Sequence, residues 1–377
     1  MKKTYIKRLI KIISLVLVLA VILGLSQRYY MKDTGNNSIR LRGFELEDPN
    51  SLDVIVLGAS EVYSDFSAVE FYEKSGVTSY PYAYAANPVT FWKYELKEIL
   101  RTQKPKVLVV ETNGVVYGDD MLYKEASVRY LADNMKLLPE KRELVEKYGT
   151  DDKLSYFFPI IKYHGEWQNR DRMKNALTML KMDMRGYSLL KGSFSHTAHK
   201  KMDTKQRDYD PDKKKELNPE AEKYLREFLE DCQNSGIEHI LFVRFPHQVA
   251  GKKSVQALER CNRAAEIVGE YGFEYVDLDD YCEEADIHKP DDFHNSDHLM
   301  MTGQKKFTDF LAKYLTDRYD LQPTQLTEKQ EKEWQECCRY MDACFAYFED
   351  YRKNPTESDE YVIYEREKNL KEIEKYL

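Results

Sequence analysis

Long apolar runs, basic stripes and internal repeats are scarce or absent in this sequence of 377 residues. The formal net charge of -8 comes from mixed signs along the chain, whereas nucleic-acid binding needs clustered positive charge, so we expect no nucleic-acid partner. No cysteine precedes Cys232, and no zinc-ligand spacing occurs, so we expect neither a metal nor a cofactor. On one helix Cys337 and Cys344 would lie on the order of 10 Å apart, too far for a disulfide. We therefore expect buried thiols.

One long uncharged run does occur, near the N-terminus, from Ile12 to Gln27. With Leu9 and Ile10 its length is close to the lower limit of about 17 residues for a membrane-spanning helix. Positive residues precede it and predict a cytoplasmic N-terminus: Lys2, Lys3, Lys7, Arg8 and Lys11. A cleaved signal peptide is the alternative, but no small-x-small pattern follows the run. We predict a single-pass protein of the cell membrane, with a cytoplasmic stub and anchor in residues 1–31 and an extracytoplasmic C-terminal body.

The rest of the chain alternates strand-like and helix-like patterns after a polar linker at 32–50. Strands are predicted at 53–57, 79–86, 106–111, 240–244 and 274–278, and helices at 90–101, 218–233, 255–271 and 302–319. This alternation predicts an α/β domain at 51–322, with a flavodoxin-like parallel sheet and helices on both faces. The segment 119–217 interrupts the rhythm and is predicted as an insertion. A helical extension at 323–377 carries an apolar stripe that packs on the domain or binds a partner.

Two polar residues follow predicted strands where ligands bind in open parallel sheets. Ser60 comes just after the first strand, and Gly58 is expected to let the backbone turn sharply between them. His298 lies between the last strand and the last helix of the domain. A serine nucleophile needs a base within hydrogen-bond reach, so these two residues are candidates for nucleophile and base. On the alternative interpretation Ser60 only caps the helix that follows.

The sequence around these residues resembles the SGNH/GDSL hydrolase superfamily over about 50–322. The segment 53–66 (DVIVLGASEVYSDF) resembles the family's first block, with Gly58-Ala59-Ser60 in place of Gly-Asp-Ser. The segment 293–303 (FHNSDHLMMTG) resembles its last block, Asp-x-x-His-Leu-Asn-x-x-Gly. The stretches KEILRTQKPKVLVVE, PIIKYHGEW and ILFVRFP are similar to a membrane-anchored, Gram-positive branch of that superfamily. Members of that branch are anchored partners of membrane-bound O-acyltransferases.

The resemblance implies roles for several residues. Ser60 would be the nucleophile and its own N–H part of the oxyanion hole, with His298 as general base. Asn113 would bind the oxyanion, and Asn87 is the nearest match to a further donor of the second block, whose glycine is not clearly present. Where the family has Asp to orient the histidine, this sequence has Asn295, which we expect to reach His298 from the same helix face. Asn can hold the ring, but it stabilises an imidazolium poorly and is expected to risk the wrong tautomer.

Arg244, at the end of the fourth strand, is predicted to meet an anionic substrate or to pair with a carboxylate. His164 and Trp167 are predicted to line the cleft or a packed helix surface. The implied function is an extracytoplasmic serine esterase or O-acyltransferase acting on a cell-envelope polysaccharide or a teichoic-acid-like polymer, in partnership with a membrane-bound O-acyltransferase. The alternative is a catalytically impaired binding or assembly protein that kept the fold and lost the acid.

Overall fold

The central sheet has five parallel strands in the order β2–β1–β3–β5–β6. In a computed structural model, which describes residues 2–29, 36–136, 138–166, 168–200, 209–353, 362–365 and 367–377, the strands span Val54–Gly58 (β1), Ser79–Ala83 (β2), Val107–Glu111 (β3), His239–Arg244 (β5) and Glu274–Asp277 (β6). Counted along the chain this order is 2-1-3-4-5, the flavodoxin-like arrangement. All five residues of β1 are buried, as expected for a central parallel strand.

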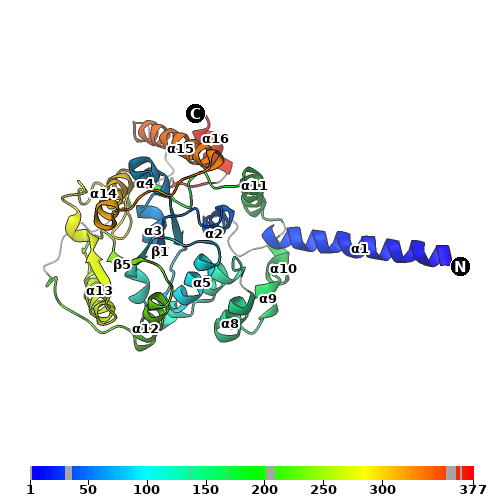
Figure 1. Ribbon diagram of the computed structural model, residues 1–377, viewed down its shortest axis with the longest axis horizontal. Helices are drawn as coiled ribbons and strands as arrows, with labels where there is room; N and C mark the ends of the chain where they lie inside the picture. The colour runs from blue at the N-terminus through cyan, green and yellow to red at the C-terminus, as the bar shows by residue number, and fades with distance from the viewer. Residues whose placement is uncertain are drawn as a thin grey trace.

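Helices cover both faces of this sheet (Figure 1). One layer contains α3 (Ser60–Asp65), α4 (Ala68–Ser75) and α14 (Met301–Tyr319), and the other contains α5 (Trp92–Thr102), α12 (Pro219–Gln233) and α13 (Lys252–Glu270). Short 3₁₀ turns are η1 (Val89–Phe91), η2 (Thr112–Val115), η3 (His164–Glu166) and η4 (Leu278–Tyr281). The five strands and the alternating helices therefore lie where the hydrophobic pattern predicts them.

The segment 119–217 leaves the sheet after β3 and returns to the domain at α12. It contains α6 (Asp119–Leu122), α7 (Glu125–Ala132), α8 (Leu138–Tyr148), α9 (Leu154–Phe157), α10 (Ile160–Tyr163), α11 (Arg170–Arg185) and the short strand β4 (Ser195–His196). The C-terminal segment adds α15 (Glu328–Lys353), β7 (Val362–Ile363) and α16 (Glu367–Ile373). β7 pairs with β4, and Trp334 of α15 stacks on Tyr72 of α4 at a ring-centroid distance of 4.6 Å. The apolar stripe of α15 thus packs on the domain.

The predicted linker at 32–50 is the main error of the sequence interpretation. Residues 32–35 lie outside the described part of the chain, but 36–46 form a helix, α2 (Asn36–Leu46), that packs against β2. Three of its polar residues, Asn37, Ser38 and Arg40, are buried. Arg40 donates through Nε to Ala83 O (3.4 Å), and its guanidinium lies 3.5 Å from the centroid of the Tyr63 ring. Buried hydrogen bonds and a cation–π contact stabilise this segment, and a hydrophobic pattern does not reveal them.

The N-terminal helix α1 (Lys2–Tyr29) extends away from the domain (Figure 1). Its apolar stretch Thr4–Leu25, 22 residues long, is sufficient to cross a membrane and is not buried by the rest of the protein. Both membrane anchors and signal sequences have this character. The six cysteines are free thiols, and Cys337 and Cys344 are fully buried, in agreement with the expectation from their spacing.

Candidate active site

Ser60 is placed at the carboxyl edge of the sheet by the tight junction between β1 and α3. A Cβ atom at Gly58 would lie 2.6 Å from Val62 Cγ2 and 2.9 Å from Glu111 Cβ, so glycine is required for this close packing. The φ angle of Gly58 is not in the left-handed region, so a special backbone turn, which we expected, is not the reason for the glycine. As the first residue of α3, Ser60 has a backbone N–H without a partner inside the helix.

His298 is held by Asn295 within the loop that precedes α14. Asn295 Oδ1 accepts from the backbone N–H groups of Asp297 (2.8 Å) and His298 (2.9 Å) and lies 3.0 Å from His298 Nδ1. The contact expected between the two side chains is present, but it forms across a turn and not along one face of a helix, because α14 begins only at Met301.

The same three contacts determine the tautomer of His298. Backbone N–H groups can only donate, so the Asn295 atom that faces them must be the carbonyl oxygen, which can only accept. The nitrogen of His298 that faces this oxygen must therefore carry the hydrogen. Nδ1 is protonated, and Nε2 keeps its lone pair and is available as a base. The wrong tautomer, the risk foreseen for Asn at position 295, does not occur in this geometry.

Asp65 connects α3 to the histidine loop. Its Oδ1 accepts from Leu299 N–H (2.8 Å) and from Ser64 Oγ (3.0 Å), while its buried Oδ2 has no hydrogen-bond partner in the described part of the chain. Burial raises the pKa of Asp65 well above its usual value. On the far side of the loop, a Cβ atom at Gly303 would lie 2.4 Å from Asp292 O, so only glycine lets α14 pack this closely there. The Asp65–Leu299 hydrogen bond thus joins the serine helix to the residue that follows His298.

Glu61, next to Ser60, forms a buried ion pair with His247. The two side chains, exposed by only 2% and 12%, approach to 3.8 Å between Glu61 Oε1 and His247 Nε2. His247 Nδ1 donates to Phe245 O (2.7 Å), so its Nε2 faces the carboxylate. Burial opposes a positive charge on His247, but Glu61 outweighs burial and raises the pKa of His247 to about 9. Burial likewise opposes the charge of Glu61, yet His247 and His298 lower the pKa of Glu61. The pair is therefore charged at neutral pH.

The resting hydrogen bond of Ser60 is made to this carboxylate. Ser60 Oγ donates to Glu61 Oε2 at 3.2 Å. Because the pKa of Glu61 is lowered, its carboxylate is a poor proton acceptor. Burial lowers the pKa of His298, while the charges of Glu61 and Asp297 raise it and His247 lowers it further. The net lowered pKa leaves His298 neutral near pH 7, as a general base must be.

The two asparagines predicted for the oxyanion hole lie in different surroundings. Asn113 Nδ2 donates to Glu61 Oε1, so its amide lies at the site beside Ser60. Asn87 is fully buried, and its Nδ2 donates to Gly58 O (3.0 Å) and to Glu95 Oε2 (2.8 Å). Both amide hydrogens of Asn87 are thus used to support the end of β1 in this structure.

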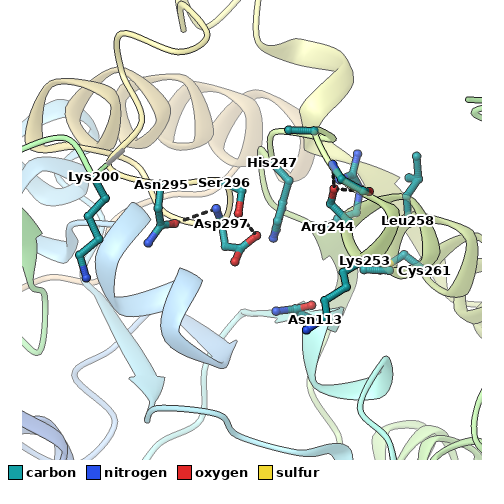
Figure 2. A pocket seen from close by; sticks show the side chains of 14 residues that line it. Asn113, Lys200, Arg244, His247, Lys253, Leu258, Cys261, Asn295, Ser296 and Asp297 are labelled. Atoms are coloured by element: carbon teal, nitrogen blue, oxygen red, sulfur yellow. Dashed lines mark hydrogen bonds between the residues drawn. The ribbon is translucent and has the colours of Figure 1, made fainter. Parts of the chain in front are cut away.

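A cavity of about 560 Å³ opens beside these residues (Figure 2). Asn113 lies on one side, the Asn295–Asp297 turn on another, and His247 projects between them. Small and apolar side chains contribute to the wall, and the cavity is lined by Asn113, Lys200, Arg244, His247, Ala250, Gly251, Lys253, Ser254, Ala257, Leu258, Cys261, Asn295, Ser296 and Asp297. Ser60 and His298 are not among these lining residues, and the cavity borders the site through Asn113 and Asn295. Its charged and apolar lining suits a substrate with both characters.

Arg244 lines this cavity but pairs with carboxylates of the protein. Its Nε lies 2.8 Å from Asp277 Oδ2, and a terminal nitrogen lies 3.5 Å from Asp279 Oδ2. The other predicted substrate-binding residue, His164, is exposed on η3, hydrogen-bonds Ile161 O (2.8 Å) and does not line the cavity. Trp167 lies outside the described residues. Within the described residues no cluster of three or more metal-ligating side chains is found.

Sequence reasoning missed Glu61 and His247. The rule that identified Arg244, that polar residues beyond the carboxyl ends of strands gather at one edge, also applies to His247, three residues beyond β5. Glu61 gave no such signal, because a glutamate in the first turn of a helix is usually a solvated residue that favours the helix dipole.

Comparisons of the sequence with known protein families and curated proteins find no match. Among solved structures, the chain is similar to a crystal structure from Parabacteroides merdae described as a GDSL-like lipase. The likeness covers 72% of this chain and 98% of that chain at 10% identity, with a TM-score of 0.32. At that score the fold assignment rests on the strand order of this chain itself: an α/β domain built on a five-stranded parallel sheet.

Proposed function

We propose that this protein is a serine esterase or O-acyltransferase of the SGNH type, with Ser60 as nucleophile and His298 as base. The observation that carries the proposal is the set of three hydrogen bonds to Asn295 Oδ1, which fixes His298 with Nε2 free. The loop that presents this nitrogen is joined to the serine helix through Leu299 and Asp65. A binding module would have no need of a histidine held in one tautomer next to a helix that begins with serine.

The chemistry follows from these positions. Ser60 Oγ turns from Glu61 to the ester carbonyl, bonds to its carbon and gives its proton to His298 Nε2. The negative charge on the carbonyl oxygen is stabilised by the Ser60 N–H and the Asn113 amide. The bond to the leaving alcohol then breaks, and the alcohol takes the proton from Nε2. In the second half of the reaction, water or a sugar hydroxyl gives its proton to Nε2 and bonds to the acyl carbon, and Ser60 leaves and regains the proton. Attack by water gives hydrolysis, and attack by a sugar hydroxyl gives acyl transfer.

Glu61 and Asp297 supply the negative charge that Asn295 lacks. When His298 accepts the proton of Ser60, its positive charge is favoured by both carboxylates, as they raise the pKa of this ring. The alternative function, an impaired binding or assembly protein, is favoured by one observation: Ser60 Oγ donates to Glu61 and not to His298 in the resting structure. The two functions differ in whether Ser60 reacts.

A fluorophosphonate probe separates them. We expect the full chain in detergent to be labelled covalently, with the adduct on Ser60. Ser60→Ala should abolish labelling, and His298→Ala should slow it at least 100-fold, in line with a general-base contribution of about 10²–10⁴. Ser75→Ala, at the far end of α4, is the matched control and should be labelled like the wild type. A folded wild-type protein that stays unlabelled from about pH 6 to 9, the range around the titration of histidine, would favour the binding protein.

The setting of this chemistry is part of the proposal. With α1 as an uncleaved anchor and positive residues on its N-terminal side, the domain lies outside the cytoplasm. The acyl esters would then belong to a cell-envelope polysaccharide or a teichoic-acid-like polymer, and a membrane-bound O-acyltransferase is the proposed partner. The support for this setting is the apolar helix together with the resemblance of the sequence blocks.

A further inference from the structure

The helix α11 has two apolar faces, and among the residues that the structure describes only one of these faces is buried against other elements. Met179 and Met182 pack with Ile39 of α2 in a small buried cluster. Four other apolar side chains of α11, spaced by four, three and four residues, are exposed to solvent. We call them the α11 stripe: Met173, Leu177, Leu180 and Met184, exposed by 54%, 44%, 38% and 80%. Residues at this spacing lie along one side of a helix.

A second exposed apolar group lies on the preceding helices. Leu154, Phe158 and Ile161, on or next to α9 and α10, are 63%, 45% and 44% exposed. α1 contacts α11, and in the view of Figure 1 α9 and α10 are drawn near the same end of α1. Exposed apolar side chains gathered along one helix face, as in the α11 stripe, mark an interaction site.

The charges of α11 indicate what covers the stripe. The helix carries five Lys or Arg residues against two Asp, although the whole chain has a net charge of -8. Lys174 and Lys181 follow Met173 and Leu180 directly, so both positions lie along one edge of the stripe, and Lys174 is 60% exposed. An apolar stripe flanked by long basic side chains is the pattern of a helix that lies in the interface of a bilayer, with its cations at the headgroups.

We propose that the α11 stripe, together with Leu154, Phe158 and Ile161, rests on the outer leaflet of the membrane that α1 crosses. The inference rests on the anchor in the proposed function, because α1 brings this side of the domain to the lipid surface. It adds that the domain contacts the bilayer surface directly, in addition to being connected to it through α1. A membrane protein as the occupant is the competing outcome of the test.

Quenching of tryptophan fluorescence by brominated lipids tests this directly. The full chain, in a Trp167→Phe background, is reconstituted into vesicles of equal parts phosphatidylcholine and phosphatidylglycerol. Leu177→Trp reports on the stripe and Val16→Trp on the anchor. Glu266→Trp is the matched control, because this side chain is 44% exposed and belongs to α13, a helix drawn on the side of the molecule opposite to α1 (Figure 1). The parent protein, with Trp92 and Trp334 buried, gives the baseline.

We expect strong quenching of Val16→Trp, clear quenching of Leu177→Trp by bromine placed close to the headgroups, and no quenching of Glu266→Trp above the baseline. Leu177→Trp at the level of Glu266→Trp, with Val16→Trp quenched, would overturn the seating while the anchor stands. A Leu177→Trp signal that changes only after a second membrane protein is added would also overturn it, in favour of a protein partner. An unquenched Val16→Trp would refute the anchor and this inference together. Labelling of Ser60 is measured separately, so failure of the chemistry is distinguishable.

Discussion

Replacing Asn295 by aspartate places a charge where the protein has a neutral oxygen. Oδ1 of the new carboxylate keeps its three donors, Asp297 N–H, His298 N–H and His298 Nδ1–H, because a carboxylate accepts as the amide oxygen does. The change therefore isolates the charge from the geometry. We expect the imidazolium form of His298 to be stabilised, because the new charge lies about 3.0 Å from Nδ1.

The size of the effect follows from Coulomb's law. At an effective dielectric of about 20, two unit charges about 4 Å apart attract by about 4 kcal/mol, and this is an upper bound for a half-buried side chain. An opposite charge at such a distance shifts a pKa by about 1–3 units, or about 1.4–4 kcal/mol. Since the pKa of His298 is lowered in the natural protein, the variant should move it to or above the usual value of about 6.5.

The assay is the pH dependence of hydrolysis of a small acetyl ester, with fluorophosphonate labelling as a second measure. Activity that needs neutral His298 is lost as pH falls through its pKa, so the acid limb of kcat/KM should move upward by about 1–3 units in Asn295→Asp. Above that limb we expect a gain of about 10- to 100-fold. This gain is smaller than the factor of about 10⁴ in serine proteases, where the tautomer is also at stake.

Ser296→Asp is the matched control for this prediction. It adds the same charge one residue away, where the natural side chain points to Asp297 (2.9 Å) and not to the imidazole ring. Its acid limb should move less than that of Asn295→Asp. Equal shifts in both variants would show that only general charge matters. No shift in a folded Asn295→Asp protein would show that His298 is not the group that limits the reaction.

Two further changes test packing. Because burial raises the pKa of Asp65, its stabilising contribution is complete below its unfolded value of about 3.9 and is lost as pH rises toward the folded value. Asp65→Asn keeps an acceptor for Leu299 N–H but cannot ionise. In urea titrations its free energy of unfolding should therefore rise relative to that of the wild type as the pH increases from about 4 to 8. A difference between the two proteins that does not change with pH would contradict a raised pKa of Asp65. Gly303→Ala should lose about 1–3 kcal/mol, because the new methyl group meets Asp292 O. Gly269→Ala, with open space around it, should gain about 0.5–1 kcal/mol by the same measurement, and equal effects would refute the packing argument.

The sequence predicted the sheet well because its strands are simple buried runs. The strand Val54–Gly58 is an apolar run that ends in glycine, and all of its residues are buried, so hydrophobic pattern and burial coincide. The same pattern failed for α2, where Asn37 and Arg40 are buried. These residues are held by hydrogen bonds to each other and, for Arg40, by a bond to Ala83 O and a ring contact with Tyr63. Such contacts arise only after distant segments have met.

The candidate site was predictable to the extent that sheet topology determines it. Ser60, Asn113 and His298 each follow a strand of the sheet, so a correct strand order predicts that all three lie at its carboxyl edge. Their protonation could not be predicted, since it depends on what surrounds each group in space. Glu111 shows this: burial, with Glu61 close by, raises the pKa of its carboxyl well above the usual value, although the sequence shows only a glutamate at the end of a strand.

Among the carboxyl groups around Ser60, the surroundings decide which are ionised and which are neutral, and the residue type does not. Asp65 and Glu111 are buried without a cation that outweighs burial, and their raised pKa values favour the neutral acid. Glu61 is as deeply buried, but His247 holds it as a carboxylate. An isolated buried charge would instead be neutralised by protonation, so the ion pair is what keeps a negative charge beside Ser60. A neutral Asn295 therefore does not leave His298 without a negative charge nearby, because the Glu61 carboxylate, which raises the pKa of His298, is kept ionised by a second histidine, His247.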